Sequence, residues 1–318
     1  MTCLLGIDSG GTKCDAVLVD DSGKMLGRGR CDRQDRIGAR HIGGVGRADE
    51  TVSLAVREAL SRVEGIERLH VAGWSIDRLS LPESFSGSVV AHGVREQDAP
   101  MALAGVSCGV VVLAGTGAFC FGRTPDGREL LLDGIGPLYG DHGGAYQIGL
   151  AGVRACGRST WEARFQTTLA EVIPAACKEF VGQAEPFDMV GYMLDARDRS
   201  EVASLAKLVD EECQRGDRIA KHILVTAADD MFETIHCVID RLDIARDNIP
   251  LVGTGGVAVH SETYWSRICE RVASVAPGLN PIRTKLPPVL GLILATAAQI
   301  GLDMNAFRSE LADHQSDL

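Results

Sequence analysis

The 318-residue chain lacks the features by which several broad classes of protein are recognised. It has no run of Lys and Arg, and its formal net charge is -11. Because affinity for a nucleic-acid backbone comes from clustered cations, these properties exclude a typical nucleic-acid-binding protein. They do not exclude the binding of a single nucleotide, since backbone N–H groups and a metal ion can hold its phosphates with little help from net charge.

Signals for a membrane span, a leader or a disulfide framework are missing as well. The longest apolar stretch, residues 289–302, contains Gln299 and is too short to span a membrane. The start of the chain has no basic region or cleavage site, so we expect a first strand there. The ten cysteines form no CxxC pair and no metal-ligand spacing, and most lie in apolar segments, which predicts buried free thiols in a reducing cytoplasm.

Three glycine-rich turns are the most informative features that are present. Each follows a short apolar run, as a turn at the end of a strand would. Glycine lets the main chain approach a ligand, successive N–H groups can cradle anionic oxygens, and a threonine hydroxyl can donate one more hydrogen bond. A single such turn is equally typical of a hairpin or of a strand-to-helix connection. The three turns are Gly10-Gly11-Thr12, Gly115-Thr116-Gly117 and Gly253-Thr254-Gly255-Gly256.

The first two turns have the same surroundings, which indicates an internal duplication. In both places the order is strand, glycine turn, strand, Asp-Gly hairpin turn and strand. Gly11 and Gly117 lie 106 residues apart, a separation that suits two related domains. We therefore expect two α/β domains that face each other across a nucleotide-binding cleft. They are residues 1–105, completed by a C-terminal helix at 303–318, and residues 106–302, with an adenosine-binding loop.

The remaining pattern alternates strands and helices. Asp49 is a plausible cap for the first helix, and Gly216 marks a break in the longest helical stretch. Strands are expected near 69–72, 89–92 and 249–252, and helices at 49–63, from Asp98, from Gly144, within 201–242, at 261–276 and at 289–300.

In this order the motifs resemble the sugar kinase, Hsp70 and actin ATPase superfamily, and within it the N-acetylglucosamine kinases that are grouped with the BadF/BadG/BcrA/BcrD ATPases. The resemblance implies two duplicated ribonuclease H-like domains. It also implies an ATP- and Mg²⁺-dependent kinase that acts on an amino sugar or related hexose, most simply N-acetylglucosamine to its 6-phosphate. The motifs that carry it are residues 6–13, 113–117, 140–149, 253–256 and 288–291.

The resemblance also implies roles for the residues of the three turns. Asp8 would hold Mg²⁺ through water, although an Asp beside a glycine turn can also be a turn former that bonds its own backbone. The phosphates would be approached by Gly10, Gly11, Thr12 and Lys13, with Gly115, Thr116 and Gly117 as the opposite wall. The adenosine would be received by Gly253, Thr254, Gly255 and Gly256.

On the sugar side the resemblance implies that Asp98 is the general base, which accepts the proton of the attacking hydroxyl. Before Ala99 and Pro100, Asp98 is also an ordinary helix N-cap. Asp141 would lie close to the sugar and phosphates, and its alternative role is a cap for the helix that starts near Gly143.

The chain departs from the family pattern at several sugar-side positions. His142 stands where the family usually has Glu, and it would change which sugar group the site can bind unless it is a surface residue. The loop 36–41 has no Asn, and the usual Trp before the Gly-Asp segment is replaced by Gly134-Ile135-Gly136. In the substrate-side loop that contains Asp77, Trp74 is equally suited to stacking on a sugar and to core packing.

Two other functions stay open at this level. One is an ATPase that drives an electron-transfer partner, which would need cysteines from a symmetric interface to bind an iron–sulfur cluster. The other is a sugar-sensing regulator without catalysis. A small-molecule sugar is the expected partner, with no nucleic acid and no membrane, and a homodimer is the candidate assembly.

Overall fold

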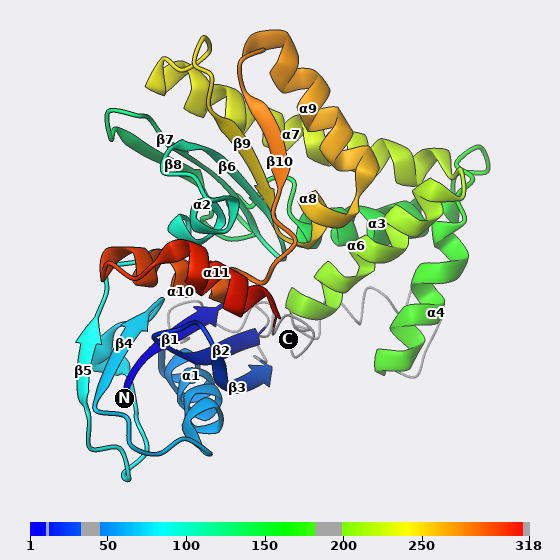
Figure 1. Cartoon of the computed structure of the whole chain (residues 1–318). Coiled ribbons are helices and arrows are strands. Elements are labelled where there is room, and N and C mark those ends of the chain that lie inside the picture. The colour runs from blue at the N-terminus through cyan, green and yellow to red at the C-terminus, as the bar shows by residue number, and fades with distance from the viewer. Residues whose placement is uncertain (11–12, 33–44, 182–198, 314–318) are drawn as a thin grey trace. The chain divides into compact units, whose positions relative to one another are not determined.

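A computed structural model describes residues 1–10, 13–32, 45–181 and 199–313. The chain divides into two compact units (Figure 1). Unit 1 contains the described residues up to Val106 together with those from Leu286 onwards, and unit 2 is Ser107–Lys285. Residues 286–302 thus lie in unit 1, whereas the sequence interpretation assigned them to the second domain.

Unit 1 is built on a five-stranded sheet in the order β3-β2-β1-β4-β5. The central strand β1 is antiparallel to β2 and parallel to β4; β3 is antiparallel to β2, and β5 is parallel to β4. The bounds are β1 Thr2–Ser9, β2 Lys13–Asp20, β3 Met25–Asp32, β4 Arg68–Ala72 and β5 Ser88–Ala91.

Helices cover both faces of this sheet because the apolar side chains of β1 alternate. Leu5 and Ile7 pack in one core cluster with Val52 and other residues of α1, and Leu4 packs in another with Leu290 and other residues of α10 and α11. The helices are α1 Val45–Leu60, the one-turn helix η1 Ile76–Arg78, α2 Asp98–Ala104, α10 Pro288–Gln299 and α11 Met304–Asp313.

Glycines bring these helices close to the strands. A Cβ on Gly29 of β3 would overlap the carbonyl oxygen of Ala55 in α1, and one on Gly6 of β1 would lie 2.8 Å from the carbonyl oxygen of Val289 in α10. The contact of α10 with β1 through Gly6 explains why the late helix belongs to unit 1.

Unit 2 repeats the same sheet. Its strand order is β10-β9-β6-β7-β8, with β6 in the centre, antiparallel to β7 and parallel to β9. Because β6, β7, β8, β9 and β10 correspond in order and direction to β1, β2, β3, β4 and β5, the predicted duplication is confirmed. The bounds are β6 Gly109–Ala114, β7 Ala118–Arg123, β8 Glu129–Asp133, β9 Pro250–Thr254 and β10 Asn280–Arg283.

The helices of unit 2 form a larger layer than those of unit 1. The long helix α7 packs on β7, where a Cβ on Gly122 would lie only 2.6 Å from Val238. Its N-cap is Asp217, directly after the expected break at Gly216, and the Asp217 carboxylate accepts the N–H groups of Ile219 and Ala220. The helices are α3 Ala145–Ser159, α4 Leu169–Val181, α6 Arg199–Gln214, α7 Arg218–Leu242, α8 Gly256–His260 and α9 Glu262–Val275.

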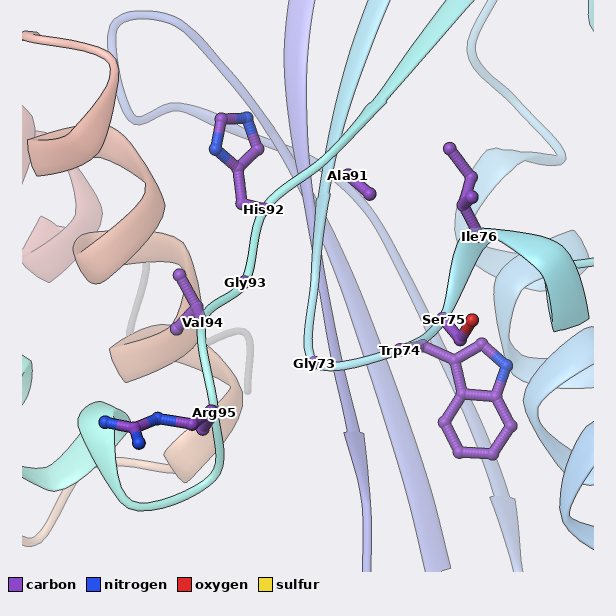
Figure 2. A pocket seen from close by; sticks show the side chains of 9 residues that line it. All are labelled: Gly73, Trp74, Ser75, Ile76, Ala91, His92, Gly93, Val94 and Arg95. Carbon is purple, nitrogen blue, oxygen red and sulfur yellow. The ribbon is translucent and has the colours of Figure 1, made fainter.

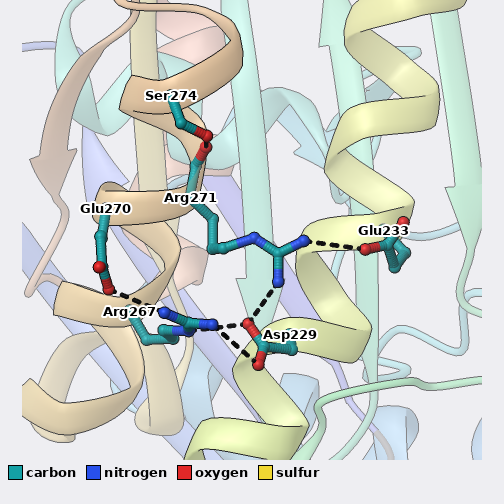
Figure 3. Close-up of polar contacts among 6 residues, drawn as sticks. All are labelled: Asp229, Glu233, Arg267, Glu270, Arg271 and Ser274. Carbon is teal, nitrogen blue, oxygen red and sulfur yellow. Dashed lines mark hydrogen bonds and ion pairs between the residues drawn. The ribbon is translucent and has the colours of Figure 1, made fainter.

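An ion-pair network joins α7 to α9 (Figure 3). Arg267 donates to both carboxylate oxygens of Asp229, at 2.8 and 3.2 Å, and Arg271 donates to Asp229 and to Glu233. The Arg271 guanidinium also lies 4.1 Å from the ring centroid of Phe232. Such a network of partly buried pairs stabilises helix packing more than isolated surface pairs do.

Two further properties follow from the described part of the chain. All ten cysteines are free, as predicted, but only five of them are buried, and Cys237 is exposed. No helix that the structure describes combines the length and the apolar character needed to cross a bilayer.

Candidate functional site

In unit 1 the carboxyl ends of three parallel strands, β1, β4 and β5, lie next to one another. The loop after β4 crosses close to the end of β1, since Gly73 has φ +84° and a Cβ there would overlap the Ile7 carbonyl oxygen. Ligands of α/β sheets bind at such edges. This edge therefore gathers Gly10 after β1, the Trp74 loop after β4 and the segment after β5 that leads to Asp98.

Asp8 lies within β1, so the interpretation of it as a turn former is wrong. It is directly opposite Asp15 of β2, and cross-strand partners of an antiparallel pair place their side chains on the same face. Burial, followed by the Asp15 charge, raises the pKa of Asp8 to about 6, although Lys13 opposes this rise. No donor among the described residues bonds this carboxylate, so a cation would find it available. Gly11 and Thr12, predicted to contact phosphate, lie outside the described residues.

Lys13 does not extend freely toward a ligand. Its ammonium group lies 2.7 Å from the buried Asp15 carboxylate. Asp15 is also approached by Arg28 at 3.5 Å and by Arg30 at 4.0 Å. Three cations thus surround the Asp15 carboxylate and offset its charge.

A pocket of about 460 Å³ opens between the loops that follow β4 and β5 (Figure 2). Trp74 and Arg95 stand on opposite sides of it. The Trp74 side chain packs against the core that contains α1, and Arg78 lies 4.6 Å from its ring centroid. One ring face is thus covered, and Asp77 is exposed in η1 beyond the pocket lining.

Asp98 is the first residue of α2, and its N-cap is Gln97, so the expected capping role is wrong. The carboxylate instead bonds Arg95 in the loop that follows β5. Oδ2 accepts from the backbone N–H of Arg95 at 2.9 Å and from its Nε at 3.0 Å, and Oδ1 accepts from Nη2 at 3.1 Å. Sequence reasoning missed Arg95, although opposite charges three residues apart at a helix start were a usable signal.

In unit 2 the second and third glycine turns are neighbours, because they follow the adjacent parallel strands β6 and β9. Gly255 has φ +86°, and a Cβ there would be 2.5 Å from the carbonyl carbon and oxygen of Ala114. Gly253 and Thr254 lie inside β9, Gly256 is the first residue of α8, and only Gly255 lies between the two elements.

Hydrogen bonds fix the turn that contains Gly115, Thr116 and Gly117. The carbonyls of Gly115 and Thr116 accept from the N–H groups of Ala145 and Tyr146 at the start of α3, at 2.8 and 3.1 Å. Gly115 N–H is used within the turn, where it donates to Gly117 O at 2.9 Å. Within the described chain, the N–H groups of Thr116 and Gly117 have no protein acceptor and could bind anionic oxygens.

The Asp141 carboxylate lies against this turn, since a Cβ on Gly117 would be 2.6 Å from Oδ2. It accepts from Gly136 N–H at 3.1 Å and from Arg199 at 3.0 Å. Burial raises the pKa of Asp141, although the hydrogen bond from Gly136 and the Arg199 charge act to lower it. Its expected capping role is wrong, because the N-cap of α3 is Gly144. Arg199 was missed.

His142 is exposed, and its Nδ1 lies 3.0 Å from Asp133 Oδ2. Its backbone N–H donates to the same oxygen at 2.9 Å, and Asp141 N–H donates to Asp133 Oδ1 at 2.7 Å. The two carboxylate oxygens of Asp133 therefore hold residues 141 and 142 in place. His142 also lines a second pocket, of about 390 Å³, with Arg154 and His222.

Comparison with known proteins agrees with this geometry. Residues 5–295 match the model of the BadF/BadG/BcrA/BcrD ATPase family. The chain belongs to that family. The glycine turns that follow the central strands β1 and β6 are consistent with membership of this ATPase family.

Two curated relatives are sugar kinases. The N-acetyl-D-glucosamine kinase of Dictyostelium discoideum is 27% identical over 318 residues, which cover 91% of this chain and 96% of that protein. The N-acetylmuramic acid/N-acetylglucosamine kinase of Clostridium acetobutylicum is 31% identical over 164 residues, about half of each protein.

Solved structures share the fold. A candidate N-acetylglucosamine kinase from Chromobacterium violaceum has a TM-score of 0.66 at 18% identity, covering 93% of this chain and 99% of the other. A ROK family glucokinase from Streptomyces griseus, solved with glucose and AMPPNP, has a TM-score of 0.52 at 16% identity, covering 94% and 98%. Together with the repeated strand order, these matches confirm the predicted sugar-kinase and actin-type ATPase fold.

Proposed function

We propose that this ATPase-family member is an ATP-dependent sugar kinase that phosphorylates N-acetylglucosamine at its 6-hydroxyl. The similarity to the Dictyostelium discoideum kinase, which extends over 91% of the chain, is the observation that carries the proposal. The glycine turns after the two central strands, β1 and β6, support it, because phosphoryl transfer depends on positioning and on neutralising phosphate charge.

For the nucleotide, we assign phosphate contacts in unit 2 to the N–H groups of Thr116 and Gly117. In unit 1 the Gly10 N–H donates to the Lys13 carbonyl oxygen at 3.0 Å, so no phosphate contact is assigned to it. Gly255 and Gly256, at the start of α8, are assigned to the adenosine. Asp8 is assigned to Mg²⁺ through water, and its half-buried, unbonded carboxylate fits a cation that would favour the ionised form. When bound, Mg²⁺ would neutralise phosphate charge.

Asp98 is assigned as the general base. The sugar hydroxyl oxygen forms a bond to the γ-phosphorus while the bond from that phosphorus to the β–γ bridging oxygen breaks, and ADP leaves. The hydroxyl proton passes to the Asp98 carboxylate. The pocket between the Trp74 and Arg95 loops is the candidate site for the sugar ring, with the exposed edge of Trp74 as one wall.

A coupled ADP-release assay tests the proposal with N-acetylglucosamine, glucosamine, N-acetylmannosamine, glucose and no sugar. We expect stimulation by N-acetylglucosamine, a loss of about 100-fold or more in kcat for Asp98→Asn, and no change for Asp21→Asn in an exposed turn. Parent-rate turnover by Asp98→Asn would remove the base assignment. Fast hydrolysis that no sugar stimulates would favour an ATPase that drives another protein.

A further inference from the structure

Arg95 makes three contacts with one carboxylate, all within unit 1. Its backbone N–H and Nε both donate to Asp98 Oδ2, and its Nη2 donates to Oδ1. The guanidinium therefore meets the carboxylate in a two-pronged arrangement that fixes the carboxylate plane. Asp98 Oδ2 is tied to both the main chain and the side chain of the same residue, so the loop after β5 and the start of α2 act as one rigid piece.

Solvent reaches this ion pair from the side of Arg95, whose side chain is 44% exposed, whereas that of Asp98 is 16% exposed. Water screens the charge on the arginine side, and ordering a long side chain costs entropy, so the contribution of the pair to stability is reduced. The first turn of α2 has backbone hydrogen bonds of its own, from Asp98 N–H to Arg95 O at 3.0 Å and from Ala99 N–H to Glu96 O at 3.3 Å. The side-chain contacts are thus not needed to form the helix start.

Arg95 also lines the pocket that faces Trp74. Asp98 itself is absent from that lining, and its side chain is only 16% exposed. Arg95 is consequently the residue through which the pocket wall and the candidate base are connected.

We propose that Arg95 is a positioning residue, which orients the Asp98 carboxylate toward the hydroxyl of a sugar held in the pocket. This inference rests on the proposed function, in which Asp98 accepts the proton. A general base must lie within hydrogen-bond reach of its proton, and an error of about 1 Å costs about 100-fold in rate. A carboxylate released from the guanidinium can rotate about its side-chain torsions and loses that placement.

The test compares Arg95→Ala, Arg95→Lys and the parent in the sugar-dependent ADP-release assay. We expect Arg95→Ala to lower kcat by about 10- to 100-fold with an unchanged KM for ATP. Arg95→Lys should have a kcat between those of Arg95→Ala and the parent, because an ammonium is a point charge without the two-pronged geometry of a guanidinium. Added guanidinium ion should raise kcat of Arg95→Ala, whereas the same concentration of sodium ion should not.

Arg308→Ala is the matched control. Arg308 donates to the Ala102 carbonyl on the same helix, α2, and does not contact Asp98. Its kcat should equal that of the parent. Comparable losses in both variants, or no guanidinium rescue of Arg95→Ala, would overturn the positioning role.

The outcomes also separate this inference from the proposed function. If the parent is stimulated by N-acetylglucosamine and Asp98→Asn is inactive, but Arg95→Ala has the parent kcat, only the role of Arg95 is wrong. If no sugar stimulates the parent, the proposed function itself is wrong. If N-acetylglucosamine stimulates the parent but Asp98→Asn keeps its rate, the base assignment is wrong, and the role of Arg95 falls with it.

Discussion

Replacing Asp8 by Asn should make the protein more stable and inactive at the same time. Asp8 is half-buried and faces Asp15 across the β1–β2 pair. Burial, with help from the Asp15 charge, raises its pKa from 3.8 to about 6. The ionised carboxylate is therefore unfavourable in the folded protein at neutral pH, whereas the proposed Mg²⁺ role requires that charge.

The magnitude follows from linkage between protonation and folding. A pKa that rises from 3.8 to about 6 on folding corresponds to roughly 3 kcal/mol of lost stability at neutral pH. Water reaches part of the Asp8 side chain and screens its charge, so we expect about 2 kcal/mol. Asn has nearly the same shape without the charge, and Asp8→Asn should recover this amount.

The pKa shift also determines how the stability of the parent changes with pH. Between pH 3.8 and about 6 the folded parent holds a proton on Asp8 that the unfolded chain has lost, so its stability falls as the pH rises through this window. Urea unfolding of parent and Asp8→Asn at pH 4, 5, 6 and 8 should show a difference that is near zero at the lowest pH and full at pH 8.

Asp21→Asn is the control for this experiment, since Asp21 is exposed in the β2–β3 turn. It should change the free energy of unfolding by less than about 0.5 kcal/mol. A gain for Asp8→Asn that does not vary with pH, or a loss of stability at pH 8, would refute the reasoning. Full kinase activity in Asp8→Asn would separately refute the metal assignment.

Three further predictions concern unit 2. Gly149→Ala in α3 should destabilise the folded protein by about 1–3 kcal/mol, because its Cβ would overlap the Val202 carbonyl oxygen. Gly157→Ala in the same helix should be neutral or should stabilise the protein by up to about 1 kcal/mol. Thermal unfolding of the two variants compares them directly. Asp229→Asn should lower the Tm at pH 7. Burial alone would raise the pKa of Asp229, but Arg267 and Arg271 outweigh it and hold the pKa lower, so the difference in Tm should begin to shrink as the pH falls below 3.8; a difference that grows below pH 3.8 would contradict this. Arg199→Met should raise the KM for ATP about 10-fold at low salt, because it leaves the Asp141 carboxylate unpaired beside Gly117, and a parent-like KM would remove Asp141 from the phosphate site.

Local patterns in the sequence were sufficient to predict the repeated sheet. Strand, glycine turn, strand, Asp-Gly hairpin and strand are signals within a few residues of one another, and they recur in the order that the structure shows. The break at Gly216 was equally local, and Asp217 caps the helix that follows it. Features fixed by neighbours in sequence are therefore the ones that sequence reasoning recovered.

Capping was predicted less well, since a carboxylate near a helix start has several uses. Asp49 was taken as the first cap, but α1 begins at Val45 and the Asp49 side chain pairs with Arg78. Asp98 and Asp141 likewise bond arginines and not the first turn of a helix. Asp141 and Arg199 are 58 residues apart, so no local pattern could have indicated that pair.

The duplicated sheets differ in the chemistry that they place after their parallel strands. Unit 1 supplies carboxylates, with Asp8 at the end of β1 and Asp98 after β5, and these groups suit cations and protons. Unit 2 supplies backbone N–H groups, and the one carboxylate beside its turn, Asp141, is already neutralised by Arg199. A duplicated fold needs such a difference to become a kinase, because two copies of an anion-binding turn could hold a nucleotide but could not accept a proton. Both Asp98 and Asp141 are paired with an arginine, but only the partner of Asp98, Arg95, lines the pocket of unit 1, and this difference supports the proposed assignment of proton transfer to Asp98.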